Sequence, residues 1–242
     1  MPDFPLSRRD ALKLAGAGAL AAAAGKAVAE DAVAPGPADV FIVVDVQNDF
    51  LPGGSLAVKN GDEVIAPINA LAKKFVNVVQ TQDWHTKGHI SFASAHGGKK
   101  PFETTDLAYG TQVLWPDHCV QGSTGAAFSD KLELPTVQLI IRKGFHPQVD
   151  SYSAFLEADK TTRTGLAGYL NERGIKRVFV AGLATDFCVA WTALDARAAG
   201  FEVYMIEDAS RGIDAMGSLS IALRNMDAAG VKRIKSGIIL GA

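Results

Sequence analysis

Hydrophobic residues in this chain gather in short runs that longer, mixed segments separate. Six runs are rich in valine and isoleucine, and each has about the length of a buried β-strand. They are Val40–Val46, Phe75–Thr81, Val137–Arg142, Arg177–Gly182, Glu202–Glu207 and Val231–Ser236. Segments with helical patterns lie between most of them, namely Gly61–Lys74, Thr162–Arg173, Asp186–Ala199 and Asp214–Ala229. This alternation predicts an α/β fold in which helices cover both faces of a parallel sheet.

The ends of these runs are where a binding site is expected, because ligands of open parallel sheets bind beyond the carboxyl ends of the strands. The segment 83–138 strengthens this expectation. It is long and contains glycine, histidine, proline and tryptophan residues, and long ordered loops in compact domains usually serve a function. We therefore predict a loop here that contributes to the site.

Three reactive side chains follow three of the runs: Asp45, Lys143 and Cys188. Burial at the end of an apolar run would raise the pKa of Asp45 unless a cation lies nearby. Cys188 opens a predicted helix, whose N-terminus favours the thiolate over the thiol. Each residue alone has an ordinary explanation, as a turn aspartate, a solvated lysine or a buried structural cysteine. Together they supply a nucleophile, a base and a cation that tunes both.

A metal site is indicated by Asp83 and His85, which follow the second run. In an extended chain, residues i and i+2 point the same way, so this carboxylate and this imidazole can converge on one ion. Such donors suit zinc, iron or manganese. His89, His96 and His118 are further candidate ligands, and the hydrophobic setting of His118 favours it.

Composition excludes three classes of protein: disordered chains, nucleic-acid binders and disulfide-stapled scaffolds. The 242 residues are 48% hydrophobic and 21% charged, which provides enough apolar material for a folded core. Lysine and arginine number 24 against 26 acidic residues, so the net charge is −2. The chain therefore lacks the basic footprint of a nucleic-acid binder. Only two cysteines are present, which excludes a disulfide-stapled scaffold.

The start of the chain is patterned like an export signal. Arg8 and Arg9 precede the apolar run Leu14–Gly25, and Ala27 and Ala29 occupy the small-residue positions before a cleavage site. This order is typical of a secretory signal peptide, and the paired arginines resemble a twin-arginine (Tat) signal. The run is shorter than the roughly 20 residues of a transmembrane helix. We therefore expect no stable membrane anchor once the signal is cleaved.

These features predict three parts of the chain: a Tat-type signal peptide at residues 1–29, a linker at 30–38 and one folded domain at 39–242. The expected location is the periplasm, or the cytoplasm if the signal is not used. The sequence leaves homo-oligomerisation open.

Six motifs follow one another along the chain: Val43–Phe50, Gln82–His85, Trp115–Cys119, Lys143-Gly144, Asp150–Phe155 and Gly182–Val189. Each motif alone is weak, but six in one order are specific. Together they resemble the motifs of the bacterial nicotinamidases (pyrazinamidases) in the isochorismatase-like cysteine hydrolase family, whose hydrolase domain would span residues 39–242. The resemblance extends over nearly all of the chain from about Asp39 onward.

The resemblance implies an open, doubly wound sheet of six parallel strands in the order 3-2-1-4-5-6. It implies hydrolysis of nicotinamide to nicotinate and ammonia, a step of NAD salvage, through a thioester. Cys188 would attack the amide carbon, Asp45 would take and return the proton, and Lys143 would stabilise the thiolate and hold Asp45. The backbone N–H groups of Ala184 and Cys188 would bind the oxyanion beside a cis Leu183–Ala184 peptide.

The resemblance also implies one divalent metal ion, of zinc, iron or manganese, held by Asp83, His85 and His118. That ion would bind the pyridine nitrogen of the substrate and orient it. His89 matches a position that ligates metal in only some members and is left out of the core set. We also expect Phe50, Trp115 and Tyr152 to line the pocket for the pyridine ring. Phe187 departs from the Tyr or His that members often carry before the nucleophile, which is expected to alter the pocket edge.

Three other functions fit these residues less well. A related cysteine amidase of another small amide would use the space of the predicted metal site differently. Isochorismatase itself lacks a nucleophilic cysteine, so Cys188 argues against its vinyl-ether chemistry. A catalytically silent, nicotinamide-binding protein would have no need of Asp45, Lys143 and Cys188 together. An assay for released ammonia separates the binder from the enzymes.

Overall fold

The structure, a computed structural model, describes residues 32–241. The predicted signal peptide therefore lies outside the described residues. None of the helices in the described part of the chain is both long and apolar enough to cross a membrane.

The centre of the fold is a six-stranded sheet in which all neighbouring strands run parallel. Its order is β5-β2-β1-β6-β7-β8, which is 3-2-1-4-5-6 when the six strands are numbered along the chain, as predicted. All six predicted strands are present, with ends that differ by a few residues. They are β1 (Asp39–Val44), β2 (Asn77–Asp83), β5 (Val137–Lys143), β6 (Arg177–Leu183), β7 (Glu202–Arg211) and β8 (Lys232–Ile234).

The central strand β1 shows how the core is built. Side chains alternate across a strand, so Phe41 and Val43 belong to one hydrophobic cluster, and Val40, Ile42 and Val44 belong to another. All five are fully buried. Because both faces of β1 are covered, the strand is a continuous apolar run rather than an alternating one.

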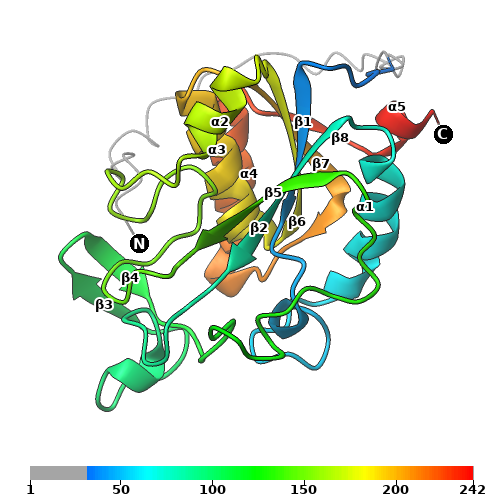
Figure 1. Ribbon diagram of the computed structural model, residues 1–242. Helices are drawn as coiled ribbons and strands as arrows, with labels where there is room; N and C mark the ends of the chain where they lie inside the picture. The colour runs from blue at the N-terminus through cyan, green and yellow to red at the C-terminus, as the bar shows by residue number, and fades with distance from the viewer. Residues whose placement is uncertain (1–31, 242) are drawn as a thin grey trace, which may run out of the picture.

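Helices cover both faces of the sheet, as predicted (Figure 1). The first cluster packs against α1 (Ile65–Ala72), which lies on the same side as the short α5 (Gly237–Leu240). The second cluster packs against the other three helices. These are α2 (Leu166–Glu172), α3 (Ala190–Ala198) and α4 (Ser218–Ala228).

Two elements differ from the sequence-based prediction. The segment 83–138, expected to be a loop, contains an antiparallel hairpin of β3 (Thr104–Leu107) and β4 (Gly110–Val113) that extends away from the main sheet (Figure 1). Its strands have only four residues each and several polar side chains, so no apolar run marked them. The predicted helix at 186–199 begins instead with a π-helical turn, Thr185–Val189, which leads into α3.

Gly182 allows β1 and β6 to approach closely just before the candidate site. Its φ is 130°, and a Cβ atom at this position would overlap the backbone of Val44. Only glycine combines this conformation with this close approach. The spacing of the two central strands therefore depends on the absence of one side chain.

Gly182→Ala is expected to lower the free energy of unfolding by about 3 kcal/mol, because the new methyl group overlaps Val44 in an unfavourable conformation. Urea unfolding followed by circular dichroism measures the change. Gly168→Ala in α2 is the control, since Gly168 is exposed and has nothing within 4 Å of its Cβ position. That variant should gain up to roughly 1 kcal/mol from helix propensity. Equal unfolding midpoints for the two variants would contradict the prediction.

Candidate active site

Four chemically active side chains lie at the carboxyl ends of four adjacent strands. Asp45 directly follows β1, Asp83 ends β2 and Lys143 ends β5. Cys188 lies in the π-helical turn that follows β6. Asp83 and Lys143 are direct register partners in the sheet. The pairing of parallel strands thus brings together residues that are far apart in the sequence.

Lys143 is the centre of this cluster. Its ammonium Nζ lies 2.8 Å from Asp45 Oδ2, 2.7 Å from Asp83 Oδ1 and 3.3 Å from Cys188 Sγ. It also donates to the Ser151 carbonyl oxygen at 3.2 Å. Lys143 is only 1% exposed, so the alternative of a solvated lysine at a strand end is wrong. The three reactive side chains predicted from the sequence do lie together.

Burial and charge set the protonation of the cluster. Burial would lower the pKa of Lys143, but the Asp45 and Asp83 carboxylates raise this pKa well above its usual value. The ammonium therefore stays charged. Burial raises the pKa of Asp45, and the opposing charge of Lys143 does not cancel the effect. Asp45 is thus a stronger base than an ordinary aspartate even with a cation beside it.

Burial raises the pKa of the Cys188 thiol well above the usual value, while Lys143 opposes this shift and Asp45 adds to it. This shift runs against the expectation that the helix N-terminus would favour the thiolate. The physical reason is that desolvation penalises the thiolate, and the single ammonium is shared with two carboxylates. Cys188 must lose its proton as it reacts, which requires an adjacent base.

The Asp45 carboxylate is held in a fixed orientation. Its backbone has a φ of 48°, a left-handed conformation that is uncommon outside glycine. Thr81 Oγ1 donates to Asp45 Oδ1 at 2.5 Å and accepts from the Asp45 N–H at 3.1 Å. Asp45 Oδ2 is ion-paired with Lys143 but has no partner in hydrogen-bonding geometry among the described residues. This oxygen therefore keeps a lone pair with which it can accept a proton.

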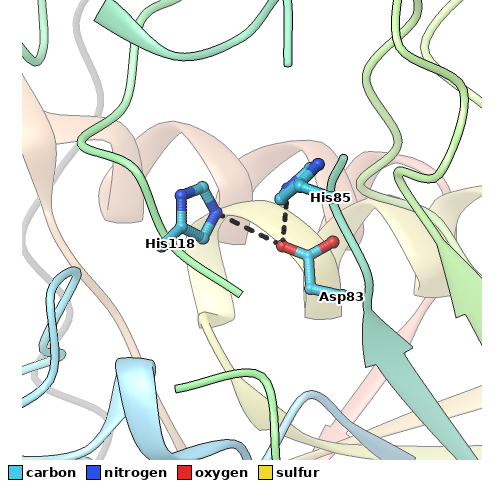
Figure 2. A group of neighbouring side chains, drawn as sticks. All are labelled: Asp83, His85 and His118. Carbon is cyan, nitrogen blue, oxygen red and sulfur yellow. Dashed lines mark hydrogen bonds and ion pairs between the residues drawn. The ribbon is translucent and has the colours of Figure 1, made fainter. Parts of the chain in front are cut away.

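The predicted metal ligands also come together (Figure 2). His85 Nε2 lies 3.1 Å from Asp83 Oδ2, and His118 Nε2 lies 3.3 Å from the same oxygen. All three side chains are buried. Burial would raise the pKa of Asp83, but His85 and Lys143 hold it well below the usual value. Asp83 is therefore an anionic ligand.

Hydrogen bonds on the far side of each imidazole indicate what fits between these residues. His85 Nδ1 lies 2.9 Å from the Gly144 carbonyl oxygen, and His118 Nδ1 lies 2.8 Å from the Pro116 carbonyl oxygen. A carbonyl only accepts, so each Nδ1 carries the hydrogen and each Nε2 faces Asp83. Burial would lower the pKa of His85, but the Asp83 carboxylate raises it, so without an ion a proton on Nε2 of His85 bridges the two groups. A metal ion between the neutral rings and Asp83 would take the place of that proton. One carboxylate and two imidazoles fit a divalent ion such as zinc, iron or manganese.

The other two candidate histidines do not join this triad. The ring nitrogens of His89 contact Ser91 Oγ at 2.7 Å and the His146 carbonyl oxygen at 2.8 Å. His96 Nε2 contacts the Ile90 carbonyl oxygen at 2.7 Å. His96 thus contacts its own loop, whereas His89 contacts both its own loop and the segment after β5. His89 also forms, with His85 and Asp150, a second group of donor atoms close enough to hold an ion.

A small cavity joins these groups. Its lining includes the metal-ligand triad and Cys188, together with the three predicted ring-pocket residues Phe50, Trp115 and Tyr152. Its volume is about 20 Å³, roughly the space for one water molecule.

Sequence reasoning missed three residues of the cavity wall, namely Leu56, Asp150 and Ile213. Asp150 begins the motif Asp150–Phe155, so a signal for it was present. Leu56 and Ile213 lie in irregular segments without a distinctive pattern, and only the folded chain brings them to the wall.

The β3–β4 hairpin supports this wall through Gln112, which sequence reasoning also missed. Gln112 Nε2 donates to Asp150 Oδ2 and to the Tyr152 hydroxyl oxygen, each at 2.8 Å. Trp115 Nε1 donates to the same hydroxyl at 3.0 Å. These bonds fix the position of Tyr152 at the cavity.

The backbone near the nucleophile has the expected form. The Leu183–Ala184 peptide is cis, as the resemblance implied. Ala184 lines the cavity, and its N–H donates no hydrogen bond to any part of residues 32–241. This N–H is therefore available to an oxyanion, next to the turn that carries Cys188.

Comparisons with known proteins agree with this architecture. Residues 39–236 match the isochorismatase domain family. A nicotinamidase of Acinetobacter baylyi is 61% identical over 200 residues, which cover 83% of this chain and 94% of that protein. The solved nicotinamidase/pyrazinamidase of Acinetobacter baumanii is 61% identical with a TM-score of 0.82, and the match covers 83% of this chain and 97% of that one.

The solved pyrazinamidase of Pyrococcus horikoshii in complex with zinc is 38% identical with a TM-score of 0.68, and the match covers 82% of this chain and 99% of that one. The family match extends over all strands of the main sheet and every candidate site residue. The chain therefore belongs to the isochorismatase family.

Proposed function

We propose that this protein is an amide hydrolase that converts nicotinamide to nicotinate and ammonia, and that also hydrolyses pyrazinamide. The observation that carries the proposal is the buried Lys143 ammonium, which contacts the Asp45 carboxylate, the Cys188 thiol and the Asp83 carboxylate. It joins the base Asp45 to the nucleophile and the metal-type donors that line one cavity. The 61% identity to a nicotinamidase supports the same substrate.

The first half of the reaction forms a thioester. Cys188 Sγ attacks the carboxamide carbon while its proton passes to Asp45, whose Oδ2 has the available lone pair. Lys143 remains an ammonium, so it stabilises the developing thiolate and holds Asp45 in place. The carbonyl oxygen becomes an oxyanion, for which the backbone N–H groups of Ala184 and Cys188 are the proposed donors.

Collapse of this adduct breaks the C–N bond. Asp45 returns its proton to the leaving nitrogen, which departs as ammonia, and the acyl group stays on Cys188. Asp45, now a carboxylate again, takes a proton from water as the water attacks the thioester. Nicotinate leaves, and Cys188 regains its proton from Asp45. One buried carboxylate thus serves as base, acid and base again, which suits its raised pKa.

The metal triad distinguishes a pyridine amide from other small amides. A divalent ion on Asp83, His85 and His118 would supply a Lewis-acidic partner for the lone pair of the ring nitrogen. The identity of the ion is proposed only as zinc, iron or manganese, and the zinc-bound pyrazinamidase structure supports zinc as one of them. Phe50, Trp115 and Tyr152 would pack on the ring and exclude water.

We further propose that residues 1–29 direct export, so that the mature protein acts in the periplasm. The proposal is supported by Arg8 and Arg9, the apolar run after them, and the small residues Ala27 and Ala29. A metal-loaded, folded enzyme is a suitable passenger for the Tat route, because the ion can be inserted before export.

Cys188→Ala should abolish ammonia release from nicotinamide while the circular dichroism spectrum and melting temperature stay close to wild type, because only the attacking sulfur is removed. Cys119→Ala is the matched control. Cys119 is also buried, and its loss should spare the acyl chemistry, although it can disturb the adjacent His118. Retention of a tenth of the wild-type rate by Cys188→Ala would exclude the thioester mechanism.

Benzamide should be hydrolysed with a kcat/KM about a hundredfold or more below that of nicotinamide, because a polar contact built for the ring nitrogen is lost in a buried site. Pyrazinamide, which keeps a nitrogen at the same position, should remain a substrate. Steady-state kinetics of the metal-loaded enzyme measure the ratio. Comparable values for benzamide and nicotinamide would favour a general aryl amidase.

The same assignment predicts the effect of metal removal. Chelation, or His85→Ala, should reduce nicotinamide turnover more than benzamide turnover and so erase much of the preference. Elemental analysis should find about one divalent ion per wild-type chain and less in His85→Ala. His96→Ala is the control, because His96 lies outside the triad; its metal content should equal that of wild type.

Export is tested by the double substitution of Arg8 and Arg9 with lysine. Wild-type cells should yield a periplasmic product that begins near Glu30, while the double variant should stay at full length in the cytoplasm. Cell fractionation and N-terminal sequencing measure both. Lys26→Arg, which conserves charge outside the paired arginines, is the control and should be exported. A mature, exported product from the double variant would indicate the Sec route instead.

A further inference from the structure

Asp186 is a buried carboxylate that the proposed mechanism does not use. It lies in the nucleophile turn two residues before Cys188 and is 5% exposed. The ion pairs found within residues 32–241 do not include it. Among residues 32–241, its side chain accepts hydrogen bonds only from residues outside its own turn. A buried carboxylate needs donors from elsewhere.

Those donors come from the connection between β7 and α4 and from the first residue of α4. Asp186 Oδ1 accepts from the Ile213 N–H at 2.9 Å. Oδ2 accepts from the Asp214 N–H at 2.8 Å and from Ser218 Oγ at 2.5 Å. Gly212 permits this approach, since a Cβ atom there would already lie 3.1 Å from Asp186 Oδ1. Charge-assisted hydrogen bonds of this kind are the stronger ones in proteins.

The connecting segment, residues 212–217, is held to the rest of the described chain mainly by these hydrogen bonds. Among the described residues, the hydrogen bonds that tie residues 212–217 to the rest of the fold all go to Asp186; the others stay within the segment and α4. Asp214 and Met216 have left-handed φ values of 55° and 54°, and Met216 is 73% exposed. Such a conformation persists only where surrounding contacts hold it.

Ile213 makes this anchor relevant to the site. Its side chain lines the cavity that Cys188 and Phe187 also line, and its own N–H is one of the three groups bound to Asp186. The Asp186 carboxylate therefore links the turn that presents the nucleophile to the segment that carries Ile213.

We propose that Asp186 is a positioning residue for the hydrolysis proposed above: it holds Ile213 against the cavity and so keeps the wall closed beside Cys188. The expected change in KM rests on the proposed hydrolysis of nicotinamide, whereas the expected exposure of Cys188 does not. Weakening the anchor opens the wall, lowers the affinity for a small planar substrate and exposes the thiol. The chemistry itself stays with Asp45, Lys143 and Cys188.

The test compares Asp186→Asn with Asp208→Asn. Asparagine keeps the shape of aspartate but replaces one acceptor oxygen by an NH2 group. This group cannot accept a hydrogen bond from the N–H and O–H groups that bind Asp186. Asp208 is the matched control on β7, because it binds the N–H and Oγ of Ser236 at 2.8 and 2.6 Å. Asp208 thus makes the same kind of contact without a link to the cavity.

The first measurement does not depend on activity. The alkylation rate of Cys188 by iodoacetamide, followed by peptide mass spectrometry, should rise about tenfold in Asp186→Asn, the factor expected for loss of one hydrogen bond to a charged group. Cys119 provides an internal reference whose rate should not change. Hydrogen exchange of residues 212–217 should speed up in the same variant. Asp208→Asn should leave both readouts at the wild-type level.

The second measurement separates positioning from a merely structural role. The KM for nicotinamide should rise about tenfold in Asp186→Asn while kcat falls less than about threefold, because loss of uniform binding affects KM alone. Ile213→Ala should shift KM in the same direction, and the double variant should add little, as expected for two residues that act together. Unchanged KM and alkylation rates in a folded Asp186→Asn protein overturn the proposal.

Two further outcomes are distinguishable. If the wild type does not hydrolyse nicotinamide but Asp186→Asn still exposes Cys188, the proposed function fails and the positioning role stands. If Asp186→Asn does not fold, Ser218→Ala removes one of the three bonds and must still raise the alkylation rate of Cys188. An unchanged rate in that variant overturns the proposal.

Discussion

One buried ammonium holds the site together. Lys143 lies between two carboxylates and a thiol, and without its charge Asp45 and Asp83 would repel each other in a region that water does not screen. Its position depends on the register of the sheet, because Lys143 pairs with Asp83 across β5 and β2. A shift of one residue in a strand would turn every side chain to the opposite face. The pairing of the strands thus determines the positions of the reactive side chains relative to one another.

The same ammonium links two tasks that different residues perform. Asp83 faces the two imidazoles with one oxygen and Lys143 with the other, while Asp45 divides its oxygens between Thr81 and Lys143. Substrate orientation and proton transfer therefore share one electrostatic centre. A change in the charge of the metal-ligand group is felt by the base, and the effect needs no motion of the backbone.

Much of this was predictable from the sequence, because strands buried on both faces appear as continuous apolar runs and their ends identify where polar residues converge. The sheet order and the residues of the site required the family resemblance in addition. What could not be predicted depends on tertiary contact. The hairpin at 104–113 has short, polar strands, so its pattern is weak. The helix position of Cys188 suggested a thiolate, but burial of the sulfur, which only the folded chain reveals, raises its pKa. Ile213 and Leu56 reach the cavity only through loops whose path no local pattern encodes.

Burial of the cysteines has a consequence for chemical durability. Peroxides and disulfides attack the thiolate rather than the thiol, and they need access to the sulfur. Burial raises the pKa values of both Cys188 and Cys119, and neither is more than 6% exposed. The two sulfurs also serve no disulfide, since both are free. Burial therefore shields the nucleophile from oxidants in two ways, by limiting access to the sulfur and by disfavouring its thiolate form.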